Sequence, residues 1–182
     1  MEVSMRVIGA CVWLVALFGA VTPLAAQGND VELGVGYQLL RLADAWFPQG
    51  FSVEVVKGLT EEFAVVGETG WSRDSTTPFG FEQRTTALHL AGGVRWNPGG
   101  DQRFRPFAQI ILGAERDIIN VKEFGSDSAS SLLVQPGGGM DVRLNNRQRV
   151  FGQVDLRRVF HEGSALNVIR TFFGWQVALL SR

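Results

Sequence analysis

The residues of this sequence that could carry chemistry lie in a few short stretches, and His161-Glu162-Gly163-Ser164 is the most suggestive of them. A histidine near a serine and a carboxylate can build a nucleophilic triad, in which the histidine removes the serine proton. Three neighbours in one short polar segment seldom reach the mutual geometry that catalysis requires. We therefore predict no catalytic residues, and keep His161, Glu162 and Ser164 as the candidates for a hydrolase.

His89 is the second residue of interest, because histidine titrates close to neutral pH. With Glu68 or Glu115 it could form a proton-linked or metal site. A histidine held in a hydrogen-bonded interior is the simpler interpretation, so the sequence predicts no metal site. The run Gly137-Gly138-Gly139 could cradle a phosphate, but neither a helix start nor Gly-Lys-Ser/Thr follows it. Packing of a strand explains the run better, and we predict no cofactor.

The elements that position these residues are predicted to be β-strands. Two-residue alternation of apolar and polar residues recurs after residue 30, whereas no sustained 3.6-residue period does. Most of the segments have about the length that a tilted strand needs to cross a membrane. The eight predicted strands lie near residues 31–41, 51–57, 63–72, 84–96, 104–116, 131–143, 149–160 and 166–179.

The connections between these strands differ in length on the two sides of the predicted sheet. Compact turns are expected at residues 58–62, 97–103 and 144–148. Longer polar loops are expected at residues 42–50, 73–83 and 117–130, with a short one at 161–165. Such asymmetry is typical of outer-membrane barrels.

Two prolines fall inside predicted strands. Pro106 and Pro136 each remove a donor from the ladder of hydrogen bonds between strands. We therefore expect strand ends or bulges at both positions.

One face of every predicted strand is apolar, as sorting alternate residues shows. Charges on this face occur only at strand ends, at Arg41, Lys57, Arg116 and Arg158. This placement suits a lipid-facing surface, because Lys or Arg there costs about 2 to 4 kcal/mol at mid-membrane and little at the interface. Aromatic residues near the strand ends fit an interfacial girdle; they are Trp46, Phe47, Trp71, Trp96, Phe104, Phe151 and Trp175.

The opposite face carries charges of both signs together with glutamines and many small residues. Buried charges persist only when they are paired, so this face predicts a network of salt bridges inside a narrow lumen. An eight-stranded interior is just wide enough for side chains to fill, which argues against a diffusion pore. The predicted members are Glu32, Glu54, Glu68, His89, Arg95, Glu115, Asp141, Arg143, Asp155, Arg157 and Arg170.

Residues 1–26 read as a cleaved secretory signal. Arg6 precedes an apolar run from Val7 to Leu17, and Ala25 and Ala26 supply the small residues that a signal peptidase needs. A retained transmembrane helix is the alternative, but Pro23 ends a run that is too short to span comfortably. The expected domain is then residues 27–182, with no cysteine and hence no disulfide. Near-equal charge, with 17 basic and 18 acidic residues, makes nucleic acid an unlikely partner.

The chain resembles the small outer-membrane β-barrel family, which includes the transmembrane domain of OmpA and OmpX. The resemblance covers residues 27–182 and is carried by Arg105-Pro106-Phe107 through Gly113, the run from Pro136 to Arg143, and Asp155-Leu156-Arg157. It implies an eight-stranded antiparallel up-and-down barrel in the outer membrane of a Gram-negative cell envelope. Outer-membrane lipid and the barrel assembly machinery are the partners that it implies.

A non-enzymatic role, structural in the envelope or interactive at the surface, is the function we expect. Exposed aromatic residues in the loops could anchor a surface partner; the candidates are Trp46, Phe47, Phe79, Phe81 and Phe124. One alternative is a lipid-modifying enzyme similar to lipid A deacylases, which would use the last loop. Another is a soluble barrel similar to lipocalins, with the apolar face turned inward.

Overall fold

The computed structural model describes residues 31–42, 45–76, 83–99, 102–121, 125–161 and 163–180. The predicted signal segment lies outside these residues. Every regular element described is a strand, and no helix among these residues is long and apolar enough to cross a membrane. The strands are β1 (Val31–Leu42), β2 (Ala45–Phe47), β3 (Gln49–Gly58), β4 (Phe63–Thr76), β5 (Gln83–Trp96), β6 (Phe104–Val121), β7 (Gly125–Arg143), β8 (Gln148–His161) and β9 (Ser164–Leu180).

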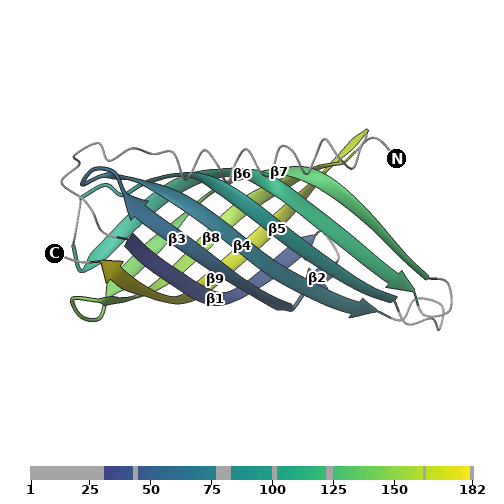
Figure 1. Ribbon diagram of the computed structural model, residues 1–182, viewed down its shortest axis with the longest axis horizontal. Coiled ribbons are helices and arrows are strands. Elements are labelled where there is room, and N and C mark those ends of the chain that lie inside the picture. The colour runs from purple at the N-terminus through teal and green to yellow at the C-terminus, as the bar shows by residue number, and fades with distance from the viewer. Residues whose placement is uncertain are drawn as a thin grey trace.

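The strands close into an eight-stranded antiparallel barrel (Figure 1). From β3 to β9 each strand pairs with the next in sequence, and β1 pairs with both β3 and β9. The short β2 continues β3 along β1, with Tyr37 opposite Phe51 and Leu40 opposite Phe47, so that Pro48 is one extra residue in an interrupted strand. The predicted count of eight is confirmed, and the second strand is longer than the sequence indicated.

The two ends of the barrel differ. Tight turns at residues 59–62 and 144–147 lie at one end, where β5 ends, β6 begins and β9 finishes beside the start of β1. Leu59 and Leu144 each close their turn by donating a backbone hydrogen bond, to Phe63 O and Gln148 O. We call this the turn end and the opposite one the loop end. The loop end contains more strand than predicted, because β4, β6 and β7 continue into the expected loops to Thr76, Val121 and back to Gly125.

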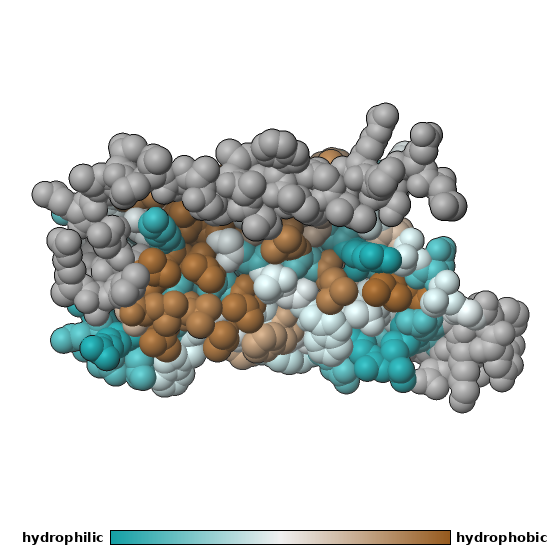
Figure 2. Space-filling model, in the orientation of Figure 1, coloured by the Kyte–Doolittle hydropathy of each residue, from teal (hydrophilic) through white to brown (hydrophobic). Residues whose placement is uncertain are grey.

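Alternation along each strand separates a buried inner face from an exposed apolar outer face. Along β8, odd-numbered residues from Arg149 to Val159 are buried while even-numbered Val154, Leu156 and Phe160 are exposed. Figure 2 shows apolar side chains on the barrel wall and hydrophilic ones toward its ends. Charges lie inside and apolar side chains outside, which is the reverse of a lipocalin-like barrel.

Not all of the girdle prediction is correct. Trp46, Trp71, Trp96, Phe104 and Trp175 are exposed, in agreement with it. Phe151 instead points into the lumen and is 5% exposed, because it shares the inward parity of Gln153 on β8. There its ring meets Phe172 edge to face at 4.8 Å between centroids.

The lumen also holds apolar side chains that the charge sorting did not predict. They form one inward cluster: Val56, Ala64, Val66, Ala91, Ile111, Leu133 and Val159. Each occupies an inward position of its strand, among the charged residues. The interior therefore combines an apolar cluster with ion pairs.

The two prolines behave differently. Pro106 lies near the turn end, where β6 pairs with β7 but β5 has already ended opposite Ala108, so one side of its backbone needs no partner in β5. Pro136 lies in the interior of β7, which contradicts the expected strand end. No register shift accompanies it. The β7–β8 pairing instead skips Gln135 and Pro136 and resumes in the same register at Gly137.

Close backbone approach at the seam requires two facing glycines. Gly36 of β1 lies opposite Gly174 of β9, and both occupy inward positions. A Cβ at Gly36 would overlap the carbonyl oxygen of Phe173, and one at Gly174 would overlap that of Val35. The pair allows β1 and β9 to close the barrel.

Candidate functional site: the lumen and the loop end

The predicted lumen residues face inward as a group. Glu32, Glu54, Glu68, His89, Arg95, Glu115, Asp141, Asp155, Arg157 and Arg170 are all buried. Arg143, at the turn end, is half-buried. Arg95, Arg157 and Arg170 are among the largest fully buried side chains in the part of the chain described here.

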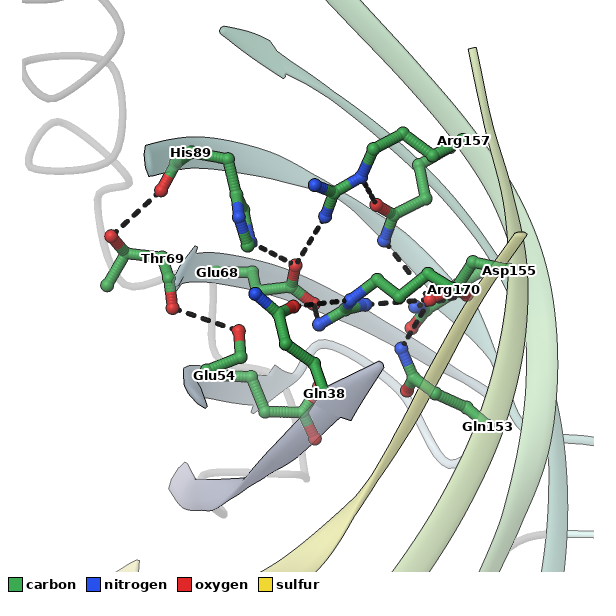
Figure 3. Close-up of polar contacts among 12 residues, drawn as sticks. Gln38, Glu54, Glu68, Thr69, His89, Gln153, Asp155, Arg157 and Arg170 are labelled. Atoms are coloured by element: carbon green, nitrogen blue, oxygen red, sulfur yellow. Dashed lines mark hydrogen bonds and ion pairs between the residues drawn. The ribbon is translucent and has the colours of Figure 1, made fainter. Parts of the chain in front are cut away.

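Arg170 is the hub of the deep lumen (Figure 3). Its Nη1 donates to Asp155 Oδ2 at 2.7 Å and its Nε donates to Gln38 Oε1 at 2.8 Å. Its Nη2 lies 3.0 Å from Glu68 Oε2. One guanidinium therefore joins β1, β4, β8 and β9, and it neutralises carboxylates that water cannot reach.

His89 belongs to the same network. Its Nε2 lies 2.8 Å from Glu68 Oε1, and Arg157 Nη2 lies 3.9 Å from the same oxygen. Arg157 also donates from Nη1 to Glu115 Oε2 at 2.6 Å. The interpretation of His89 as part of a hydrogen-bonded interior is confirmed. No group of three or more possible metal ligands occurs among the described residues.

A second set of ion pairs fills the turn end. Arg95 Nη2 donates to Glu54 Oε2 at 2.8 Å. Arg105 donates to Asp141 Oδ2 at 2.6 Å and to Glu32 Oε2 at 2.9 Å. Arg149 Nε lies 3.4 Å from Glu32 Oε1.

The sequence reasoning missed Arg105 and Arg149 as lumen residues. The signal was present, because Arg105 shares the parity of Gln109 on β6, and Arg149 that of Gln153 on β8. Both lie close to a turn, where a charge on either face of a strand is tolerated. They supply positive charge close to Glu32 and Asp141.

At the loop end the structure gives His161 a different partner from the one predicted. His161 Nδ1 lies 2.6 Å from the Oγ of Ser131 on β7. Ser164 faces His161 only as its backbone partner across the β8–β9 hairpin and is exposed. Glu162 lies outside the described residues.

Of the predicted loop contacts, Trp46 is 52% exposed, with the Arg41 guanidinium 5.1 Å from its ring centroid. Phe47 is half-buried. Phe79, Phe81 and Phe124 lie outside the described residues.

The outer part of β7 has a neighbour on one side only. Its pairing with β6 runs to Val121 opposite Gly125, whereas its pairing with β8 begins at Leu132 opposite Phe160. Residues 125–130 are exposed. We call this segment the free edge.

These features define the class: a closed eight-stranded barrel, apolar outside and filled inside by paired charges, which is the fold of small outer-membrane β-barrels. A solved structure of Ail, the attachment invasion locus protein of Yersinia pestis, matches with a TM-score of 0.57 and 12% identity, covering 82% of this chain and 97% of Ail. Neisserial surface protein A matches with a TM-score of 0.58 and 8% identity, covering 82% and 94%.

The N-terminal barrel domain of Pseudomonas aeruginosa OprF has a TM-score of 0.52 and 13% identity, covering 82% of this chain and 99% of that domain. No family model matches the chain, and no curated protein matches it in sequence. At such identities the similarity establishes the fold.

Proposed function

We propose that this protein resides in the bacterial outer membrane and that its main role is to bind a partner at the cell surface. The free edge of β7 carries the proposal. Membrane residence is supported by the exposed apolar wall, where Leu90, Ile110, Val154 and Phe173 are each 48% to 55% exposed. A soluble monomer rarely exposes so continuous an apolar surface.

A binding role fits the interior better than transport does. Fully buried arginines bridge strands across the lumen, and their ion pairs would have to break for a solute to pass. Breaking such a pair leaves an uncompensated buried charge, which is costly. The barrel therefore serves as a rigid support for its loop end.

The free edge offers a specific mode of binding. An unpaired strand presents backbone N–H and C=O groups that an extended peptide can complete as a further strand. Residues 125–130 read Gly-Ser-Asp-Ser-Ala-Ser, and these small side chains leave the backbone accessible. The proposed partner is an extended polypeptide segment at the surface.

Location is tested by cell fractionation combined with heat-dependent gel mobility. We expect the protein in the outer-membrane fraction, with a band that shifts on boiling. Recovery only from the soluble periplasm would overturn the membrane assignment.

Orientation and binding are tested separately. An epitope inserted after Val121 should be labelled on intact cells, whereas one inserted after Asn145 in the turn end should not. Binding of an immobilised library of extended peptides should be lost when residues 125–130 are replaced by a proline-rich segment. The matched control places the same segment at residues 144–147; equal loss in both variants would contradict the role of the free edge.

A further inference from the structure

We propose that Ser131 and His161 form a nucleophilic centre at the loop end that cleaves carboxylic esters. This activity is additional to partner binding by the free edge. It rests on a hydrogen bond between side chains that are 30 residues apart in sequence, with 2.6 Å between Ser131 Oγ and His161 Nδ1. Such a bond is the first requirement of an activated serine.

Strand register places these groups together. Glu115 of β6 lies opposite Ser131 of β7, and both side chains face the lumen. One residue further from the loop end, Leu132 of β7 pairs with Phe160 of β8, so that Ser131 and His161 are the next residues of these two strands. Ser131 is 6% exposed, whereas His161 is half-buried at the end of β8. The pair thus lies where the lumen network ends and solvent begins.

Asp117 is the next residue of β6 after Glu115 that faces the lumen; it lies closer to the loop end and is half-buried. Its neighbour Arg116 is exposed on the outer face, so this part of β6 lies at the loop-end side of the apolar outer surface. Burial, together with the Glu115 carboxylate, raises the pKa of Asp117 to about 6, while His161 and Arg157 act in the opposite direction. Because Asp117 lies two residues beyond the partner of Ser131 on the adjacent strand, on the same inward-facing side, we assign it as a positioning residue.

The other serines of β7 lack this environment. Ser126, Ser128 and Ser130 have the opposite parity and are exposed. Ser128 Oγ accepts a hydrogen bond from Arg116 at 3.2 Å. Ser131 is consequently the serine that the fold pairs with a histidine, which gives matched controls within one strand.

The reaction is a two-step acyl transfer. Ser131 Oγ attacks the ester carbonyl carbon as its proton passes to His161, the C–O bond to the alcohol breaks, and the alcohol leaves with that proton. Water then attacks the acyl-serine while His161 takes a proton from it, and the carboxylic acid leaves as Ser131 recovers its proton. The net change is ester plus water to acid plus alcohol.

The test uses a short-chain alkyl fluorophosphonate on the full-length protein purified from outer membranes, with labelled peptides identified by mass spectrometry. Attack by Ser131 Oγ forms an O–P bond and expels fluoride, so labelling reports the nucleophile without knowledge of the natural ester. We expect Ser131 to be labelled, and hydrolysis of p-nitrophenyl butyrate to follow the same variants. Absence of labelling in the wild-type protein would overturn the proposal.

Variants separate the centre from its surroundings. Ser131→Ala should abolish labelling and His161→Gln should slow it by about 100-fold, the lower range for loss of a general base. Ser130→Ala and Ser164→Ala should label at the wild-type rate. Asp117→Asn should slow labelling, and Asp117→Glu should restore most of it at unchanged thermal stability. Heat-dependent mobility confirms that each variant is folded; equal labelling of folded His161→Gln and wild type, or labelling at Ser164, rejects the centre.

Discussion

The deep lumen and the loop end are built from the same strands but differ in what surrounds them. Within the barrel each strand has two neighbours, and inward residues such as Gln135 and Arg157 are fully buried. From Ser131 toward the loop end, β7 pairs with β6 but no longer with β8, and residues 125–130 are exposed. Loss of one neighbour converts a strand from a structural wall into an available edge, so stability and binding are expected to separate along one strand.

The largest expected effect on stability is that of Arg170→Met, which tests the role of the deep lumen in this comparison. The substitution leaves Glu68 and Asp155 buried without their shared cation, and such losses cost about 3 to 5 kcal/mol. Urea unfolding in detergent micelles measures the change. Arg158→Met is the control, because Arg158 lies on the outer face of the neighbouring strand, and its free energy of unfolding should change by less than about 1 kcal/mol. Equal effects would mean that the lumen network does not stabilise the barrel.

Barrel closure provides the second test. In Gly36→Ala the new methyl group meets the backbone of Phe173, and overpacking of this kind costs about 1 to 3 kcal/mol. Less of the protein should show the heat-dependent mobility shift after refolding. Gly152→Ala is the matched control, since a Cβ there meets nothing within 4 Å and the position faces outward. If both variants fold equally well, the glycine pair is not needed at the seam.

Much of the barrel was predictable, because alternation alone assigns each side chain to a face. The lumen charges Glu54, Arg95 and Arg170 could be placed in this way. The ends of the strands could not, since the extension of β6 from Asp117 to Val121 and the first residues of β7, Gly125 to Ser130, do not alternate between apolar and polar residues.

The pair Ser131 and His161 was beyond sequence reasoning for a related reason. Its members come from different strands, and only the register between β7 and β8 brings them together. Sequence proximity instead suggested Ser164, which meets His161 through the backbone of a hairpin. The alternation of residues along one strand predicts which face each side chain is on, whereas a site formed by two strands also depends on the register between them.

The third test removes the free edge. Replacing residues 118–128 with a tight Asn-Gly turn deletes the outer part of β7, which pairs with β6 only, together with the end of β6, and leaves the lumen network intact. The free energy of unfolding should change by less than about 0.5 kcal/mol, the range of surface changes. Urea unfolding measures it, with Arg170→Met as the reference for a true lumen defect. A loss close to that of Arg170→Met would show that the outer strands stabilise the barrel after all.

A small effect that depends on pH is expected from Asp117→Asn. Because the pKa of Asp117 is raised from 3.8 to about 6, the folded state holds its proton more tightly than the unfolded state. Folding stability from this group is therefore greatest below pH 4 and falls as the pH rises through 6.

The asparagine variant removes that fall. Its free energy of unfolding in urea should equal the wild-type value near pH 3.5 and exceed it slightly at pH 8, by less than about 1 kcal/mol because the group is partly exposed. A wild-type midpoint above that of the variant at pH 8 would mean that the carboxylate stabilises the fold. The expected sign instead means that the ionised carboxylate of Asp117 lowers folding stability at neutral pH. The deep lumen differs, because there Arg170 holds its carboxylates in direct ion pairs.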